Sequence, residues 1–309
     1  MKNARRATYA RGRGVGTACW KSAALVCGLF LSGATLAAAV SYSDVGATAA
    51  DLTGGGDALT RFRSDLGANN GVGPAAGVTA GRREINWDAP ALDAVADPNF
   101  MPNDQFNRLA APFARGAQFS TPGSGFLVSR RCEQDGGTAP CGGGNILFGL
   151  GGGQPNNVNL QAFSAQRIFA PVGSNQMDVT FDVAGSPGTR ASVSAFGAIF
   201  LDVEVANLTT MEFFDLAGSS LGVFAADSGA DASMSFLGVR FDAGEAIGRV
   251  RLTLGDMILT GHGSLGPTLS DYVALDDFIY SEPKAVAEPG ILALIAAGLL
   301  AGVRRRRRS

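Results

Sequence analysis

Carboxylates are the residues of this sequence whose type and spacing best suit a chemical site. Two segments far apart in the chain carry them: REINWDAP holds Glu84 and Asp88, and VALDDFIY holds Asp276 and Asp277. Carboxylate oxygens are the hard ligands that Ca²⁺ prefers, and extracellular modules bind it weakly, with Kd values of about 10⁻⁴–10⁻³ M. We interpret the four acids as a candidate calcium site. The alternative is that they accept backbone hydrogen bonds at turns.

The sequence contains few residue combinations that are typical of catalytic sites. His262, in LTGHGSLG, is the single histidine, so a multi-histidine zinc site is excluded and any Ser-His-Asp triad must use it. The sequence has no H-E-x-x-H motif, and His262 is expected in a solvated loop. Two acids about 5–10 Å apart can hydrolyse glycosides, but nothing singles out such a pair among the 27 acidic residues. We predict no catalytic residues and keep a secreted polysaccharide hydrolase as the alternative.

Trp87 and a cysteine pair are the remaining candidates. Trp87, inside INWD, can stack on a sugar ring if it lies on a binding face, or it can fill the core of the domain. Cys132 and Cys141 enclose a segment rich in Gly. In an oxidising compartment an even pair of this kind predicts a disulfide.

The elements that position these residues are predicted to be strands. From Arg82 onward, short runs with period-two alternation recur between Gly, Pro, Asp and Asn turns. About ten such runs without helical spacers indicate antiparallel pairing, so we predict an all-β fold over residues 82–283, a two-sheet β-sandwich of jelly-roll type. The runs are INW (85–87), AQFS (117–120), GFLVS (125–129), MDVTFDV (177–183), SVSAFGAIFLDVEV (192–205), TMEFFD (210–215), SLGVFAAD (220–227), SFLGVRF (235–241), IGRVRLTLG (247–255) and YVALDDFIY (272–280).

Residues 40–81 are expected to form a separate lead-in to this domain. Leu59, Phe62 and Leu66 recur at helical spacing and Gly67 follows them, so we predict one short amphipathic helix there, with loop and linker around it. In jelly-roll carbohydrate-binding modules the first and last strands often lie together, and acids there hold a structural ion. By that analogy the segments around Glu84 and Asp276 should converge.

Charge is distributed very unevenly along the chain. The composition is 46% hydrophobic and 17% charged, with 43 glycines, which fits a loop-rich exported β-protein. All 27 acids lie between residues 44 and 288, whereas 11 of the 25 basic residues lie at the two ends, so the body carries a net charge of −13. An acidic body argues against nucleic-acid binding.

Residues 1–39 are interpreted as a secretory signal peptide. A basic, acid-free start is followed by the apolar run AALVCGLFLSGATLAAA (23–39), which ends in small residues. The Ala-x-Ala pattern at Ala37 and Ala39 predicts cleavage after Ala39. The Sec translocon and signal peptidase are the expected partners.

The C-terminal segment also has the pattern of a targeting signal. In AEPGILALIAAGLLAGVRRRRRS (287–309), Glu288 and Pro289 precede an apolar stretch. The apolar stretch Gly290 to Val303 would make roughly 20 Å of helix against a hydrocarbon core of about 30 Å. That is short for a lasting anchor. The arginine cluster behind it is typical of the cytoplasmic flank of a membrane segment, and its members are Arg304, Arg305, Arg306, Arg307 and Arg308.

This tail resembles the PEP-CTERM sorting signal of exported proteins of Gram-negative bacteria, which has Pro-Glu-Pro, a short apolar helix and an arginine cluster. Ala287 departs from the pattern, since the first proline usually stands there. The body is also similar to uncharacterised proteins that carry such tails, in stretches such as GRREINWDAP (81–90) and VALDDFIYSEP (273–283).

The resemblance implies sorting by an exosortase. The chain would be held briefly in the inner membrane through its tail and then released to the cell surface or extracellular matrix. It further implies a structural or carbohydrate-binding role in an exopolysaccharide or biofilm, with exopolysaccharide as the expected partner.

Overall fold

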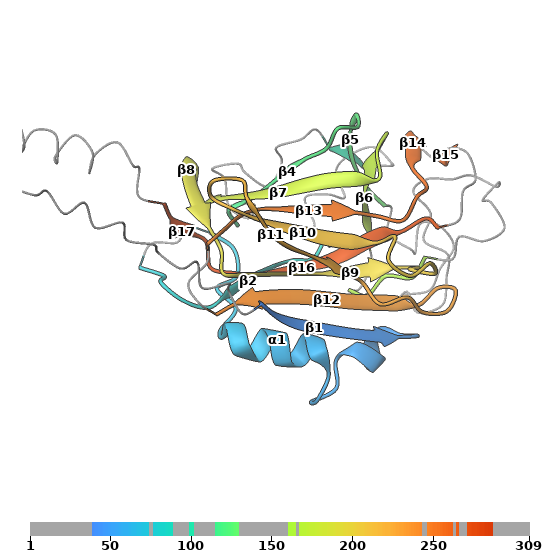
Figure 1. The fold of residues 1–309 in the computed structure, drawn as a ribbon, viewed down its shortest axis with the longest axis horizontal. Helices are drawn as coiled ribbons and strands as arrows, with labels where there is room; N and C mark the ends of the chain where they lie inside the picture. Colours follow the sequence, from blue (N-terminus) through green and yellow to red (C-terminus); the bar gives the residue numbers. More distant parts are fainter. Residues whose placement is uncertain are drawn as a thin grey trace, which may run out of the picture. The chain divides into compact units, whose positions relative to one another are not determined.

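The structure is a computed structural model. It describes residues 39–73, 77–88, 99–101, 115–129, 160–164, 167–242, 246–261, 264–265 and 271–286, all of which belong to one compact unit, Ala37–Ser309. The described strands form two mostly antiparallel sheets, and one short α-helix packs on the larger sheet (Figure 1). The prediction of an all-β protein with two sheets is confirmed.

The larger sheet contains the central strands of the fold. Its strands are β1 (Ala39–Gly46), β2 (Arg82–Ile85), β3 (Asn99–Met101), β5 (Gly125–Val128), β6 (Phe169–Val172), β9 (Ala195–Leu201), β12 (Met234–Phe241), β14 (Leu259–Gly261), β15 (Ser264–Leu265) and β16 (Ala274–Ser281). They follow the order β1-β12-β9-β16-β6-β14-β15, with β2 beside β16 and with β5 between β3 and β6. The β6–β14 pair is parallel.

The smaller sheet faces the larger one across a shared core. Its strands are β4 (Ala117–Ser120), β7 (Gln176–Val183), β8 (Ser186–Ser192), β10 (Thr210–Asp215), β11 (Ser220–Ala225), β13 (Ile247–Thr253) and β17 (Lys284–Ala285). The order is β11-β10-β13-β7-β8-β17, with β4 paired to β7. Met177, Val179 and Phe181 of β7 enter the shared core together with Phe196 and Phe278 of the larger sheet. The alternation expected for residues 177–183 is therefore confirmed.

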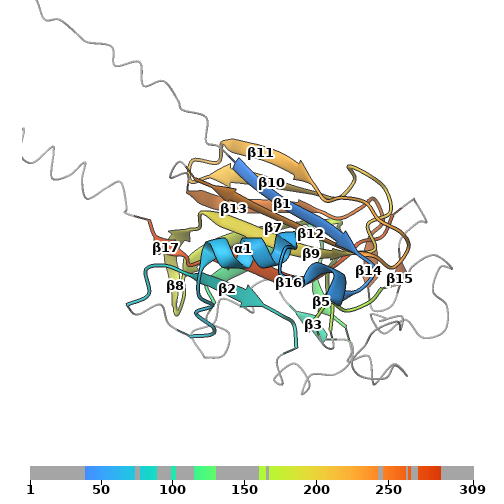
Figure 2. The same cartoon turned by 90° about the horizontal axis from the view of Figure 1, so that it is seen from below.

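A second core lies on the opposite face of the larger sheet. It is covered by η1 (Ala49–Leu52) and α1 (Ala58–Leu66), and Figures 1 and 2 show α1 against β1 and β12. Leu59, Phe62 and Leu66 face this core as the helical spacing predicts, and the helix ends at Gly67, whose φ of 89° suits glycine. Because both faces of the sheet are covered, β9 and β16 are buried along their whole length.

A pair of glycines lets the helix come close to the sheet. Gly197 of β9 and Gly238 of β12 stand directly opposite each other. A Cβ atom on Gly238 would lie 2.9 Å from the ring of Phe62 and 2.8 Å from the ring of Phe236. The absent side chains therefore make room for the two aromatic rings.

Several strands were not predicted from the sequence. The segment AVSYSDVG was expected to be the end of the signal peptide and a loop, yet β1 pairs with β12 along its full length. The lead-in is thus part of the larger sheet. The strand expected at 85–87 instead spans Arg82–Ile85, whereas β4 and β10 have the predicted bounds.

Candidate functional site

An irregularity in β16 places two acids side by side inside the protein. The register between β16 and β9 shifts between Leu275 and Phe278, so Asp276 and Asp277 together stand opposite Ile199. Leu275 and Phe278 both face the core between the sheets. Two residues that stand opposite one residue of the partner strand define a β-bulge. Both acids contact groups on the α1 side of the sheet.

Asp276 is held by the segment 160–164. Its Oδ2 accepts hydrogen bonds from the backbone N–H groups of Phe163, at 2.7 Å, and Ser164, at 3.2 Å. Its Oδ1 accepts one from Ser164 Oγ at 2.9 Å. The same Oγ lies 3.0 Å from Oδ2 of Asp88. Ser164 thus joins the acid after β2 to the acid in β16.

Asp277 turns toward the helix. Its Oδ2 is 3.4 Å from Nη2 of Arg63, which lies on α1. Arg63 is bound more closely by Glu84, with Nε–Oε1 at 3.2 Å and Nη2–Oε2 at 2.7 Å. Arg82 Nε also donates to Glu84 Oε1 at 2.6 Å. Glu84 is therefore an ion-pair partner of two arginines, and its oxygens are engaged by guanidinium groups.

Burial and like charge raise the pKa values of the two neighbouring acids. Desolvation is the main cause for both. The negative charge of Asp277 further raises the pKa of Asp276, well above its usual range, although hydrogen bonds from Ser164 and Phe163 oppose this rise. The pKa of Asp277 is raised to about 6, and Ser164 and Arg63 limit the rise. A bound proton or a nearby positive charge therefore stabilises the two carboxyl groups of Asp276 and Asp277.

The four acids of the calcium hypothesis are thus brought into one neighbourhood. β2 pairs with β16 in the register Ile279↔Glu84, so the segments around Glu84 and Asp276 converge as predicted. Ser164 and Arg63 belong to the same neighbourhood and were missed, because each lies at least 112 residues from its partner in β16. Nothing in the local sequence signals such contacts.

Trp87 fills the core, which is one of the two roles expected for it, and the other role, on a ligand-binding face, is wrong. The side chain is 1% exposed. Its ring stacks on Phe169 with centroids 3.8 Å apart, and Nε1 donates to the backbone oxygen of Asp276 at 2.9 Å. The indole is therefore covered by protein and cannot stack on a sugar.

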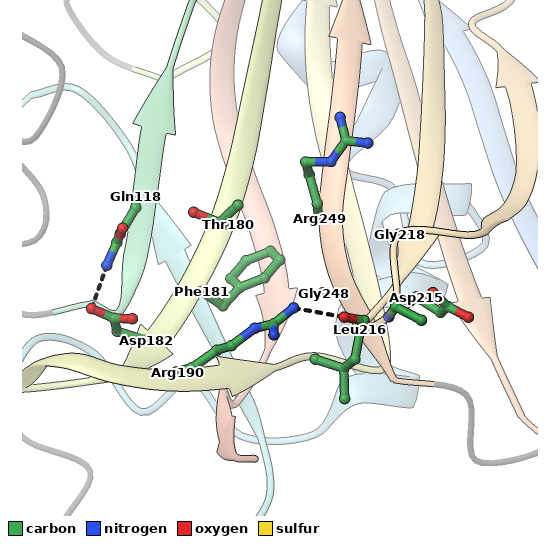
Figure 3. A pocket seen from close by; sticks show the side chains of 11 residues that line it. Gln118, Thr180, Phe181, Asp182, Arg190, Asp215, Leu216, Gly218, Gly248 and Arg249 are labelled. Carbon is green, nitrogen blue, oxygen red and sulfur yellow. Dashed lines mark hydrogen bonds between the residues drawn. The ribbon is translucent and has the colours of Figure 1, made fainter. Parts of the chain in front are cut away.

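A second feature is a cleft on the outer face of the smaller sheet, with a volume of about 440 Å³. In Figure 3, Gln118 points to Asp182, and Arg190 reaches across toward the backbone of Leu216. Arg190 Nη2 donates to the Leu216 oxygen at 2.8 Å. The lining residues were not predicted, because they lie on five different strands and a turn that only the fold brings together.

Arg249 forms one side of this cleft. Its guanidinium carbon lies 3.6 Å from the centroid of the Phe214 ring, and Nη1 donates to Asp178 Oδ2 at 3.1 Å. Stacking and ion pairing together fix a flat donor group at the rim.

The two carboxylates of the cleft are engaged by the backbone. Asp182 Oδ2 accepts hydrogen bonds from Gly188 N at 2.6 Å and from Gln118. Asp215 Oδ1 accepts from the N–H groups of Ala217 and Ser219, both at 2.8 Å, within its own turn. Such acids hold turns in place, and neither is placed as a free general acid.

Another acidic group, missed by the sequence reasoning, joins Asp202, Glu204 and Asp231, whose carboxylate oxygens lie within 4.8 Å of one another. Glu204 and Asp231 are exposed, and Asp202 Oδ1 accepts a hydrogen bond from Ala232 N at 2.7 Å. Exposed acids of this kind are common in the absence of any ion.

Several predicted sites lie outside the described residues. These are His262, the proposed disulfide of Cys132 and Cys141, Ala37 of the signal-cleavage motif, and the sorting residues Glu288, Pro289 and Arg304 to Arg308. Ala39 is described and begins β1. Within the described part of the chain, no helix has the length and apolar character needed to cross a membrane.

Comparisons of the chain with protein-family profiles, with curated protein sequences and with solved structures gave no match. The chemistry of the chain's own residues is therefore the basis for its function.

Proposed function

We propose that this chain is an exported, non-catalytic polysaccharide-binding protein of the cell surface or extracellular matrix. The signal-peptide pattern at residues 1–39 and the PEP-CTERM-like tail at 287–309 support export and sorting. We infer further that the two sheets form a jelly-roll sandwich, the tail forms the sorting helix, and an exosortase removes it.

The cleft on the smaller sheet is the observation that carries the binding proposal. It presents flat hydrogen-bonding groups on a fixed β-scaffold: the guanidinium groups of Arg190 and Arg249 and the amide of Gln118. Such groups suit vicinal hydroxyls, which offer two hydrogen-bonding atoms side by side. Two arginines and two aspartates line the cleft, so their formal charges cancel. This balance favours a neutral, polyhydroxylated ligand.

Binding is favoured over hydrolysis by the roles of Asp182 and Asp215. Glycoside hydrolysis needs one carboxylic acid that donates a proton and a second that acts as nucleophile or base. Both acids of the cleft instead accept backbone hydrogen bonds, which fix the orientation of each carboxylate and hold it in its own turn or strand.

A glycan-array screen of the purified exported protein tests this proposal. We expect binding to neutral polysaccharide that falls at least tenfold in Arg190→Ala. Arg61→Ala is the matched control, because Arg61 is equally exposed but lies on α1, and it should bind normally. Equal binding by both variants would locate the ligand elsewhere, and release of reducing ends from the bound glycan would favour the hydrolase.

The sorting proposal has its own test. Mass spectrometry of the released protein should show a chain that lacks residues 290–309. Recovery of the intact tail on secreted protein would refute exosortase processing.

A further inference from the structure

Asn70 and Gly71 form the only Asn-Gly dipeptide of the sequence. Asparagine is one of the thermolabile residues, because the backbone nitrogen of the next residue can attack its side-chain amide. Glycine in the next position leaves this attack unhindered, since it carries no side chain and adopts a wide range of backbone angles. Gly71 is exposed, has a φ of 66°, and would meet no described atom within 4 Å if it carried a Cβ. The described part of the chain therefore packs nothing against this turn.

The side chain of Asn70 fastens the turn to a buried ion pair. Its Nδ2 donates hydrogen bonds to Glu282 Oε2 at 2.8 Å and to the Ala80 oxygen at 2.9 Å. The Glu282 side chain is 1% exposed and is paired with Arg83. A Cβ atom on Gly81 would lie 2.9 Å from Nδ2 and 3.0 Å from Oδ1 of Asn70. The amide is therefore fixed between Glu282 and the backbone of Gly81.

The closed turn keeps the two reacting groups engaged elsewhere. The N–H of Gly71 donates to Asn69 Oδ1 at 2.8 Å, and both hydrogens of Asn70 Nδ2 are already used. The backbone N–H of Asn70 donates to the Arg82 oxygen at 2.9 Å. Attack by the Gly71 nitrogen requires these hydrogen bonds to break first. The reaction therefore proceeds through local opening of the turn.

We propose that Asn70 is a site of spontaneous deamidation whose conversion weakens the contact between this turn and the Arg83–Glu282 pair. The Gly71 nitrogen forms a bond to Asn70 Cγ, the Cγ–Nδ2 bond breaks, and Nδ2 takes up the proton from the Gly71 nitrogen and leaves as ammonia. Water then opens the cyclic imide at one of its two carbonyl groups. One product is aspartate, and the other is isoaspartate, in which the backbone passes through Cγ.

The new carboxylate has the wrong hydrogen-bonding character for its surroundings. An ionised carboxylate only accepts hydrogen bonds, whereas Glu282 Oε2 and the Ala80 oxygen are both acceptors that Asn70 now serves as donor. Two hydrogen bonds are lost, and a second negative charge comes to lie beside Glu282. Gly81 leaves the side chain no space on its own side. The product therefore favours the open turn, so the reaction removes the protection that slowed it.

The modification would release the segment after α1 from β2 and from the end of β16. Glu282 directly follows β16, and Arg83 lies in β2. This site is on the larger sheet and is independent of the proposed polysaccharide cleft on the smaller one.

Peptide mapping of the full-length protein after incubation in mildly alkaline buffer tests the chemistry. Trypsin releases residues 64–82, which contain Asn69 and Asn70 and no other asparagine, and fragmentation assigns the converted residue. We expect conversion at Asn70 and not at Asn69, roughly tenfold slower in the folded protein than in urea, because the turn must open first. In urea, where native strain has no effect, Gly71→Ala should slow the conversion roughly tenfold.

Thermal unfolding of Asn70→Asp tests the consequence, because this variant has the side chain of the aspartate product. Its Tm should be lower by roughly 4–8 °C. The matched control is Asn69→Asp, which adds the same charge at an exposed neighbour and keeps the acceptor for the Gly71 N–H. It should shift the Tm by less than about 2 °C. In the Glu282→Gln background, Asn70→Asp should be neutral or stabilising, since the glutamine amide can donate to the new carboxylate.

The proposal is overturned if Asn70 stays intact in the folded protein after the urea-unfolded chain has been fully converted, or if Asn69 is converted as fast as Asn70. It is also overturned if Asn70→Asp has the same Tm as Asn69→Asp. Equal destabilisation by Asn70→Asp with Glu282 and with Gln at this position would show that the new charge does not act on the buried pair.

Discussion

The buried ion pair between Arg83 and Glu282 offers the sharpest test of how the larger sheet is held together. Both side chains are 1% exposed, and two parallel hydrogen bonds of 2.8 Å join them, Nε to Oε2 and Nη2 to Oε1. Asn70 donates to Glu282 Oε2 at 2.8 Å, and Arg83 Nη1 donates to the Gly73 oxygen at 2.9 Å. The pair thus joins β2, the end of β16 and the segment after α1.

Glu282→Gln keeps the volume of the side chain and removes its charge. The Arg83 guanidinium then stays buried without its carboxylate, and breaking a buried pair in this way costs about 3–5 kcal/mol. Because whole domains are stable by only about 5–15 kcal/mol, we expect the urea midpoint to fall by about a fifth or more with little change in slope. Replacing both residues, Arg83→Met with Glu282→Leu, should restore most of the stability, since neither charge remains buried.

Urea unfolding followed by circular dichroism measures both variants. Glu212→Gln is the control, because Glu212 lies on the outer face of the smaller sheet and accepts an exposed hydrogen bond from Ser220. It should change stability by less than about 0.5 kcal/mol. A loss below about 1 kcal/mol in Glu282→Gln, or a double variant as unstable as the single one, would refute the reasoning.

Two other predictions concern the α1 side of the larger sheet. Burial raises the pKa of Asp277 to about 6 in the folded protein, against an ordinary 3.8. The folded state should therefore gain stability, relative to Asp277→Asn, as pH falls from 7 to 4. The difference should approach about 3 kcal/mol; pH-independent differences in urea midpoints would contradict it. Gly238→Ala should cost about 1–3 kcal/mol, because the new Cβ overlaps the rings of Phe62 and Phe236, whereas Gly55→Ala, in open space, should be nearly neutral in the same assay.

The alternating core strands could be predicted from the sequence because their apolar residues occupy the buried positions and their polar residues the more exposed ones. In β7, Met177, Val179 and Phe181 are buried, and the polar residues between Met177 and Phe181 are only half-buried. The same holds for α1, whose apolar spacing predicted its buried face. In these elements the local sequence pattern agrees with the tertiary environment, so secondary structure and burial can be predicted from the local sequence.

The strands that were missed depend on partners far away in the chain. β1 is rich in small and polar residues and is a strand because β12 pairs with it from Ala39↔Phe241 to Gly46↔Met234. β8 contains Pro187 and Gly188, and five of its seven residues are exposed, so it lacks the apolar alternation that marks a core strand. Pairing of this kind is set by the partner's free edge, which a local pattern cannot reveal.

The bulge in β16 is indicated in the sequence by a change in the alternation of apolar residues. Val273 and Leu275 face the core between the sheets, and so do Phe278 and Tyr280, so the two-residue period changes phase across the intervening DD. A regular strand would have sent one aspartate into each core, each among apolar side chains. The phase change instead places both on the α1 side, where Ser164 and Arg63 meet them.

Two adjacent acids in a strand that is buried along its whole length are unfavourable unless their charges are balanced. Hydrophobic residues at both positions would fill the sheet without this cost. A bulge that gathers two carboxylates on one face concentrates the unfavourable charge instead of separating it. Such an arrangement stabilises the fold only when a single positive partner can serve both acids. The irregular strand and the buried charge of Asp277 thus have one origin in the bulge, and the pH dependence of stability measures how far a bound proton relieves that charge.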